Sequence, residues 1–171
     1  TAGFDVATSI ASVVTVSNTA AVVAGKAFTL TSLTDTFVGG AGADVFTADN
    51  TATASASSTA DSLTGGAGAD TLNIFSDGSV DPMPVVSSIE TINLYDVDDA
   101  IFTTATAADV TTLNVIRGDG NAQGVIVAAG TTVNLSTITL AEVGTAVSVT
   151  HAAATTSATI GVDGVVGDAD G

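Results

Sequence analysis

A glycine-rich segment that occurs twice constrains the fold of this chain more than any other feature. The sequence Gly-Gly-Ala-Gly-Ala-Asp fills residues 39–44 and returns at residues 65–70, followed each time by an apolar residue two places on. An Asp-x-apolar triplet precedes each copy, beginning at Asp35 and Asp61, so that half-turns of nine residues become visible. Internal repeats of this kind indicate a solenoid, in which each turn of the chain stacks on its neighbour.

A second repeat, with the pattern Thr-apolar-Asn-apolar, follows in the C-terminal half. It occurs at residues 91–94, 112–115 and 132–135, with weaker echoes at 146–149 and 159–162. The spacing of about 20 residues is typical of one rung of a parallel β-helix, whose equivalent strands stack ~4.8 Å apart. Gly is frequent, β-branched residues dominate, and no helical apolar spacing is sustained. The predicted fold is all-β, a parallel β-roll or β-helix that forms one elongated solenoid.

The chain divides into three segments without a sharp boundary. Residues 1–34 are predicted to form an N-terminal β segment, residues 35–81 the glycine-rich β-roll turns, and residues 82–171 the longer rungs, continuous with the preceding part. Residues 51–59 contain only Ser, Thr and Ala, which predicts a loop. The sequence Asp-Pro-Met-Pro at residues 81–84 forbids regular strand pairing of these residues and is predicted to separate the glycine-rich turns from the longer rungs.

Composition excludes several classes of function. The formal net charge is -16, from two basic and 18 acidic residues, so nucleic acid and anionic membrane surfaces are poor partners and a divalent cation is a good one. Hydrophobic residues make up 46% of the chain, which is enough for a core, yet no apolar run is long enough to span a bilayer. The absence of Cys excludes disulfides, thiol catalysis and cysteine zinc sites.

The two glycine-rich segments resemble the RTX family, whose nonapeptide is Gly-Gly-x-Gly-x-Asp-x-apolar-x. Both copies match at every defined position, including Phe46 and Leu72 at the apolar site. The resemblance implies that the six-residue parts are calcium-binding turns of a β-roll and that the apolar residues point inward. By that likeness, the expected Ca²⁺ ligands are the backbone carbonyls and carboxylates of Gly39, Gly40, Ala41, Gly42, Asp44, Gly65, Gly66, Ala67, Gly68 and Asp70, with Asp35 and Asp61 as further candidates.

Residue chemistry points to the same ion independently. Calcium takes six to eight oxygen ligands at about 2.3–2.6 Å, and glycine reaches the backbone angles that turn carbonyls inward. Because turns alternate between the two sides of a flattened coil, we expect the turn of Asp44 to lie beside that of Asp70, and the turn of Asp35 beside that of Asp61. Ahead of Asp61, residues 57–60 replace the glycines with Ser-Ser-Thr-Ala. The simpler alternative is that all of these are ordinary tight turns with solvated Asp side chains.

Other acidic clusters are candidates for further cation sites. Asp96, Asp98 and Asp99 lie close together in sequence, and Asp168 and Asp170 do so near the C-terminus. A solvated loop is the simpler interpretation of the first cluster. The second resembles the opening of another calcium loop.

Catalytic residues are scarce. His151 is the only histidine and stands in a strand context, while Arg117 with Asp119 could be interpreted as the catalytic pair of a β-helical polysaccharide lyase or hydrolase. However, Arg-Gly-Asp-Gly-Asn at residues 117–121 is also a plain turn sequence, and aromatic residues to line a sugar cleft are lacking. The chain is therefore not expected to be an enzyme.

The longer rungs carry a second resemblance. Ser-Ile-Glu-Thr-Ile-Asn-Leu at residues 88–94, followed by residues 110–115, is similar to segments of RTX-bearing surface-layer and large adhesin proteins of Gram-negative bacteria. The likeness implies a secreted cell-surface protein with a structural role, in which calcium rigidifies the coil and promotes self-association into a lattice or filament. Two alternatives remain open. One is an adhesin or binding module, with a cell-surface polysaccharide as its partner, and the other is a calcium-binding appendage of a secreted enzyme.

Overall fold

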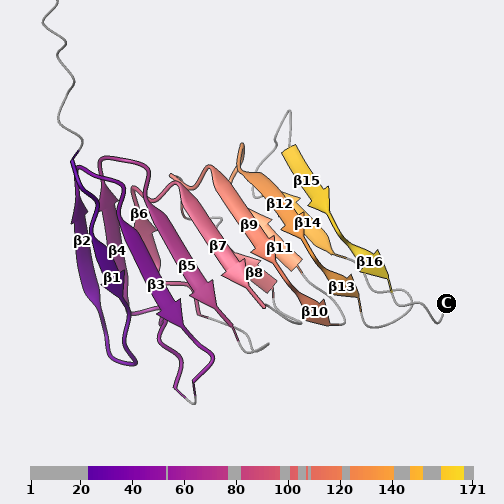
Figure 1. The fold of residues 1–171 in the computed structure, drawn as a ribbon, viewed down its shortest axis with the longest axis horizontal. Coiled ribbons are helices and arrows are strands. Elements are labelled where there is room, and N and C mark those ends of the chain that lie inside the picture. Colours follow the sequence, from indigo (N-terminus) through magenta and orange to yellow (C-terminus); the bar gives the residue numbers. More distant parts are fainter. Residues whose placement is uncertain are drawn as a thin grey trace, which may run out of the picture.

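The protein is an all-β solenoid built from parallel strands, as predicted (Figure 1). The computed structural model describes residues 23–52, 54–76, 82–96, 101–103, 107, 109–120, 124–140, 147–151 and 159–167, and none of these forms a helix. Of the predicted N-terminal β segment, residues 1–22 lie outside the described residues. The strands are, in chain order, β1 (Ala27–Thr29), β2 (Thr36–Gly40), β3 (Val45–Asp49), β4 (Ser62–Gly66), β5 (Thr71–Phe75), β6 (Val85–Ser87), β7 (Thr91–Tyr95), β8 (Ile101–Thr103), β9 (Thr112–Ile116), β10 (Asp119–Gly120), β11 (Gly124–Val127), β12 (Thr132–Ser136), β13 (Thr139–Leu140), β14 (Ser148–His151), β15 (Thr159–Asp163) and β16 (Val166–Gly167).

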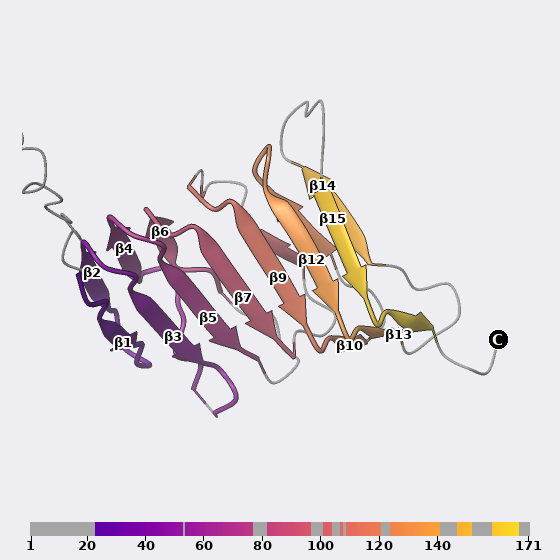
Figure 2. The ribbon, with the colours of Figure 1, turned by 45° about the horizontal axis from the view of Figure 1, so that its top comes forward.

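Four parallel sheets form the sides of the coil. The largest has seven strands in the order β1-β3-β5-β7-β9-β12-β15, so strands from all three predicted segments lie in one sheet. The three smaller sheets contain β2-β4-β6, β8-β11-β14 and β10-β13-β16. Figures 1 and 2 show the strands of the large sheet stacked in chain order, from β1 at one end of the coil to β15 at the other.

The Thr-apolar-Asn-apolar repeat sets the register of the large sheet. Thr91, Thr112 and Thr132 pair as neighbours in one column, which confirms the predicted rungs. The weaker echo at 159–162 joins the same column through β15. Of the echo at 146–149, residue 146 lies outside the described residues, and Ser148 and Val149 do not join the column, because they belong to β14, which pairs with β11 in a different sheet. Strands on other sides of the coil also alternate apolar and polar residues, so the alternation alone could not identify the sheet to which this segment belongs.

Alternate side chains of each strand fill the interior in columns. In β7, Ile92 and Leu94 are fully buried between equivalent residues of the rungs above and below. Phe46 and Leu72, the apolar positions of the two glycine-rich segments, are also fully buried. Since burying one such side chain contributes about 1.5–3 kcal/mol, each rung is stabilised by the rungs on both of its sides. The buried core comprises Leu30, Phe46, Ala48, Ala56, Leu63, Leu72, Ile74, Ile89, Ile92, Leu94, Ala107, Val110, Leu113, Val115, Val125, Val127, Val133, Leu135 and Ile138.

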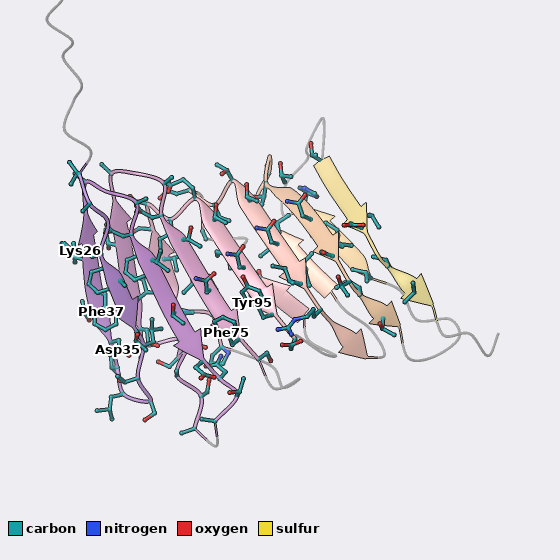
Figure 3. All side chains as sticks on the ribbon, viewed as in Figure 1. Lys26, Asp35, Phe37, Phe75 and Tyr95 are labelled. Carbon is teal, nitrogen blue, oxygen red and sulfur yellow. The ribbon has the colours of Figure 1, made fainter. Side chains whose placement is uncertain are left out.

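Aromatic rings form two separate stacks. Phe28 stacks on Phe37 and on Phe46, with ring centroids 5.2 and 4.9 Å apart, and closes the core near the first rung. Phe75 and Tyr95 stack at 4.6 Å on the outer face of the large sheet (Figure 3). Stacked pairs of this kind contribute about 0.5–1.5 kcal/mol beyond their buried area, so they reinforce the register on both faces.

A ladder of asparagine side chains runs along the outer face of the large sheet. Asn93 donates to Asn73, Asn114 to Asn93, and Asn134 to Asn114, through amide hydrogen bonds of 2.8, 2.7 and 2.8 Å. The ladder ends at Gly161, which pairs with Asn134 but has no side-chain amide, and a Cβ atom there would lie only 2.5 Å from Asn134 Oδ1. Each hydrogen bond joins two rungs and contributes about 0.5–1.5 kcal/mol to stability.

The corner that follows the large sheet repeats one unusual backbone conformation. Asp96, Arg117 and Thr137 have φ angles of 56°, 56° and 57°, and Gly164 has 65° in the next rung. These residues directly follow paired strand ends, so they form a column of left-handed residues. For a β-branched residue such as Thr137 this conformation is strained. The predicted turn is thus confirmed at Arg117, whereas Asp119–Gly120 forms the short strand β10 rather than part of a turn.

The predicted loop lies between β3 and β4. None of its described residues, 51–52 and 54–59, belongs to a strand. Asn50 organises its base from a buried position: the Oδ1 atom accepts hydrogen bonds from the N–H groups of Ala56 and Ser57, and the Nδ2 atom donates to the Ser57 hydroxyl. The prediction of a loop here is confirmed.

Candidate metal centre

The two glycine-rich turns lie directly beside one another. Strands β3 and β5, which follow Asp44 and Asp70, are paired, and the Asp44 N–H donates to Asp70 Oδ1 at 2.7 Å. The Asp35 N–H donates in the same way to Asp61 Oδ1 at 2.9 Å. Both predicted pairings of turns are confirmed. The leading glycines are not part of the turns themselves, because residues 39–40 end β2 and residues 65–66 end β4.

The two Asp residues belong to a longer column of carboxylates and amides. The Lys26 N–H donates to Asp44 Oδ1 at 2.6 Å, and the Asp70 N–H donates to Glu90 Oε2 at 2.8 Å. Each carboxylate therefore accepts an N–H group from the rung before it. Glu90 was not among the predicted site residues, although its distance from Asp70 matches the length of one rung.

Asp44 has hydrogen bonds to both of its carboxylate oxygens. Besides the bond from Lys26 to Oδ1, the Gly40 N–H donates to Oδ2 at 2.6 Å. The side chain is almost completely buried, and its charge is met by two backbone dipoles. Asp44 thus stabilises its own turn as an acceptor of N–H groups.

Asp70 differs from Asp44 in one respect. Its Oδ2 atom has no hydrogen-bond partner, and because Asp70 is 0% exposed this oxygen is also shielded from bulk water. Gly66 ends β4 as Gly40 ends β2, but it adopts a φ angle of 109° and its N–H does not donate to Asp70 Oδ2. A buried polar atom without a partner costs about 1–3 kcal/mol, so this oxygen is a natural place for a cation.

A backbone carbonyl converges on the same point as this free oxygen. The Ser88 carbonyl oxygen and Asp70 Oδ2 both lie closer than 3.0 Å to the position that a Cβ atom on Gly65 would occupy. A side chain at residue 65 would collide with both oxygens, so only glycine fits there. In the first turn, the Gly65 carbonyl oxygen and Asp44 Oδ2 converge in the same way around Gly39. The two glycines therefore allow a carbonyl oxygen and a carboxylate oxygen to approach each other closely at two equivalent places, one rung apart.

A lysine ammonium lies at the first of these turns. Lys26 Nζ donates to the Gly39 carbonyl oxygen at 2.7 Å, and it lies 3.5 Å from the position of a Cβ atom on Gly40 (Figure 3 labels Lys26). Lys26 is the only lysine of the chain. Its positive charge stands beside predicted calcium ligands, so the first turn already holds a cation of its own.

The Asp35 and Asp61 side chains are fully engaged. Asp35 Oδ2 accepts the Thr31 N–H at 2.6 Å, and the Thr31 hydroxyl lies 3.2 Å from both carboxylate oxygens. Asp61 Oδ2 accepts the Ser58 N–H at 2.7 Å, and its Oδ1 accepts the Asp35 N–H. The serine turn before Asp61 thus holds its carboxylate through local hydrogen bonds.

The donor set around Asp70 fits a calcium ion better than a softer metal. Both converging groups are hard oxygen ligands, a carboxylate and a carbonyl, which is the chemistry that calcium prefers. Among the described residues, no group of three or more His, Cys, Asp or Glu side chains comes together around a common point. An ion at this site would therefore take most of its ligands from backbone carbonyls and water, with Asp70 as the charged ligand.

The remaining candidates lie elsewhere. Asp96 forms an ion pair of 2.8 Å with Arg117, while Asp98, Asp99, Asp168 and Asp170 lie outside the described residues. His151, on β14, has its Nε2 atom 3.4 Å from the carbonyl oxygen of Thr131.

One exposed carboxylate at the end of β3 has a shifted pKa. Hydrogen bonds from the hydroxyl and the backbone N–H of Thr51 lower the pKa of Asp49 from its ordinary value. These bonds hold the start of the loop after β3 and involve none of the predicted ligands.

Comparison with protein families, curated proteins and solved structures finds no match to this chain. The described residues also include no helix with the length and hydropathy that crossing a membrane requires. The sequence motifs and the geometry around Asp70 are therefore the basis for an assignment of function.

Proposed function

We propose that this chain is a calcium-dependent structural segment of an extracellular surface layer or filament, in which calcium drives folding and assembly. The proposal combines the resemblance of its glycine-rich turns to the RTX nonapeptide with the geometry of those turns. A single observation carries it: Asp70 Oδ2, a buried carboxylate oxygen without a hydrogen-bond partner, lies beside the Ser88 carbonyl.

The free oxygen explains why an ion would favour the folded coil. Without a cation, folding must remove a charged oxygen from water and leave it unsatisfied, which is unfavourable. A calcium ion bound there would replace that cost with an ion–ligand contact. The carboxylate and carbonyl oxygens come together only when the rung of Gly65 lies beside the rung of Ser88. Binding free energy would therefore appear as folding free energy.

The charge of the chain supports the same mechanism. A formal net charge of -16 on 171 residues opposes compaction through self-repulsion, and only two basic residues offset it. In a calcium-poor cytosol the chain would remain competent for export. Outside the cell, where extracellular calcium modules work with dissociation constants on the order of 10⁻⁴–10⁻³ M, divalent cations would lower this repulsion and the coil would form.

A structural role fits the repetitive architecture. The rungs stack into a rod stabilised by buried columns, an asparagine ladder and paired turns, all of which run along the coil. The resemblance to surface-layer and adhesin proteins suggests where such a rod would be used. We therefore assign the chain a mechanical, extracellular function rather than a catalytic one.

A calcium titration with chelator reversal tests this proposal. Circular dichroism should report a cooperative gain of β signal as calcium is added to the metal-free protein, and EDTA should reverse it. Light scattering on the same samples should rise at similar or higher calcium concentrations as assemblies form. Magnesium provides the matched control, since it demands a smaller octahedral site and should be less effective. A β signal that is complete in EDTA and unchanged by calcium would contradict the proposal.

A further inference from the structure

We propose that Asp109 is a positioning residue of the calcium site, because its carboxylate holds Ser88 in the backbone conformation that directs the Ser88 carbonyl toward Asp70. This role rests on the proposed calcium function and deepens it, since it names a residue outside the glycine-rich motifs on which the affinity for calcium depends. Three features support it: the column in which Ser88 stands, its left-handed backbone, and the hydrogen bond that it donates to Asp109.

Ser88 is the third member of a column that begins with Gly39 and Gly65. Gly39 and Gly65 lie beside one another within the paired strands β2 and β4, and Ser88 directly follows the last residue of β6 that pairs with β4. The Gly65 carbonyl oxygen lies against the position that a Cβ atom on Gly39 would occupy. The Ser88 carbonyl oxygen lies in the same way against Gly65, so it takes the corresponding place in the second turn.

The corner at Ser88 is shorter than the glycine-rich turn before it. In that turn, Asp70 stands five places after Gly65. Glu90, the next carboxylate of the same column, stands only two places after Ser88. Ser88 makes this short corner with a φ angle of 49°, in the left-handed region. That conformation is unfavourable for a residue with a Cβ atom, so it persists only where the surroundings hold it in place.

Asp109 supplies a contact that holds this conformation. It lies one rung beyond Ser88, because each of the two residues stands three places before a threonine of the paired strands β7 and β9. The Asp109 Oδ2 atom accepts the Ser88 N–H at 2.8 Å. A bond from a backbone N–H to a carboxylate is stronger than one between neutral groups. Since the N–H and the carbonyl belong to one residue, holding the first restricts the direction of the second.

The conformation of Ser88 brings one acceptor oxygen toward another. Its carbonyl oxygen and Asp70 Oδ2 both lie against the position of a Cβ atom on Gly65, and Asp70 Oδ2 is the buried oxygen without a hydrogen-bond partner. Two oxygens in such an arrangement repel each other unless a cation binds them. Backbone strain of this kind is typical of positions that bind a ligand. Asp109 therefore keeps the carbonyl available as a ligand for calcium.

The same corner connects the calcium site to the rung that follows. Asp109 is next to Val110, which is buried in the core, and the N–H groups of Thr111 and Thr112 donate to the Glu90 carbonyl at 2.9 and 3.0 Å. The rung that begins at Asp109 thus docks onto the rung of the calcium site. Calcium binding should favour this docking, and by reciprocity the docked rung should raise the affinity for calcium by the same factor.

Asp109→Ala tests the positioning role through the affinity for calcium. Competition with a chromophoric chelator should give a calcium dissociation constant about tenfold higher than that of the unaltered protein, as for other outer-shell partners of metal ligands. Asp109→Asn keeps an acceptor oxygen and should raise the constant less. Asp163→Ala is the control for charge, because it removes a carboxylate from an exposed position on β15, and it should leave the constant unchanged. Equal constants for Asp109→Ala and Asp163→Ala would overturn the inference.

Ser88→Gly distinguishes positioning from a general loss of stability. Glycine adopts the left-handed conformation without strain, so the double variant Ser88→Gly with Asp109→Ala should recover most of the lost affinity. Luminescence lifetimes of one equivalent of europium(III), measured in H₂O and D₂O, count the water molecules on the bound ion. Asp109→Ala should add about one water in place of the Ser88 carbonyl, and the double variant should not. An unchanged water count in Asp109→Ala would overturn the inference. If Asp109→Ala does not fold, failure of Ser88→Gly to restore folding and affinity would do the same.

The outcomes separate the role of Asp109 from the proposed calcium function. Calcium binding by the unaltered protein that Asp109→Ala leaves intact would overturn the positioning role and leave the calcium function standing. An unaltered protein that does not bind calcium would overturn both.

Discussion

Replacing Asp70 by Asn should change the stability of the protein in opposite directions with and without calcium. The substitution keeps Oδ1, which accepts the Asp44 N–H at 2.7 Å, and exchanges the unpartnered Oδ2 for an NH₂ group beside the Ser88 carbonyl. In EDTA, Asp70→Asn thus removes a buried charged oxygen that costs about 1–3 kcal/mol, and it supplies a donor for a neighbouring acceptor. We expect the variant to unfold with a free energy about 1 kcal/mol higher than that of the unaltered protein.

With calcium the order should reverse. A calcium concentration one hundred times the dissociation constant stabilises the protein that binds it by about 2.7 kcal/mol, and the Asn variant would lack most of this gain. Urea unfolding followed by far-ultraviolet circular dichroism, in EDTA and in calcium, measures both differences. Equal slopes of the unfolding free energy against urea would show that the same cooperative unit unfolds in each case.

Two other Asp substitutions serve as matched controls. Asp44→Asn alters the same motif, but it places an amide donor against N–H groups, since both oxygens of Asp44 already accept hydrogen bonds. It should lower the unfolding free energy by about 1–2 kcal/mol in EDTA and in calcium alike. Asp163→Asn removes an equal charge from an exposed position on β15 and should leave the calcium response unchanged. Equal destabilisation by Asp70→Asn in both conditions would refute the reasoning, because Asp70 would then be only an acceptor for its neighbour's backbone.

Three further substitutions test the packing around the site and along the coil. Gly65→Ala should prevent stable folding, because its Cβ would collide with the Ser88 carbonyl oxygen. Gly40→Ala is the control and should fold, because its Cβ would lie at ordinary contact distance from the flexible end of Lys26. A Gly65→Ala variant that unfolds at the same temperature as the unaltered protein would contradict this prediction. Asn93→Ala breaks two hydrogen bonds of the asparagine ladder and should lower the unfolding free energy measured in urea by about 1–3 kcal/mol. Asn73→Ala breaks one of these bonds and should lower it by about half as much. Equal decreases for the two variants would contradict a contribution from each bond of the ladder. Thr137→Gly removes the backbone strain of a left-handed β-branched residue and should raise the unfolding free energy by about 0.5–1 kcal/mol. Gly164→Thr introduces the same strain in the next rung and should lower the unfolding free energy. A lower unfolding free energy for the Thr137→Gly variant would argue against strain at residue 137.

The solenoid could be predicted from the sequence because its two repeats recur at the length of one turn, which places equivalent residues of successive turns beside one another. Copies of Thr-apolar-Asn-apolar could be aligned without knowing the side of the coil on which they lie, and their register in the large sheet followed directly. The same reasoning failed for the echo that includes Ser148 and Val149, because these residues belong to β14 in another sheet. Periodicity identifies an inward-facing residue, but it does not identify the sheet to which that residue belongs.

The pairing of the glycine-rich turns was predictable from sequence, but the difference between Asp44 and Asp70 was not. Their motifs are identical over six residues, and the distinction depends on the φ angle of Gly66, which glycine leaves free. The hydrogen bond from Lys26 Nζ to the Gly39 carbonyl could not be predicted either, because Lys26 lies outside both copies of the glycine-rich motif. Glu90 could have been found by extending the column from Asp70 by one rung length.

A crystal structure of the protein grown with calcium would test the central claim most directly, with anomalous scattering used to identify the ion. We predict a calcium peak within ligand distance of Asp70 Oδ2 and the Ser88 carbonyl oxygen, with its remaining ligands from carbonyls or water. The contrary result is a well-ordered turn in which Asp70 Oδ2 contacts only protein N–H groups or a water molecule, with no anomalous peak beside it.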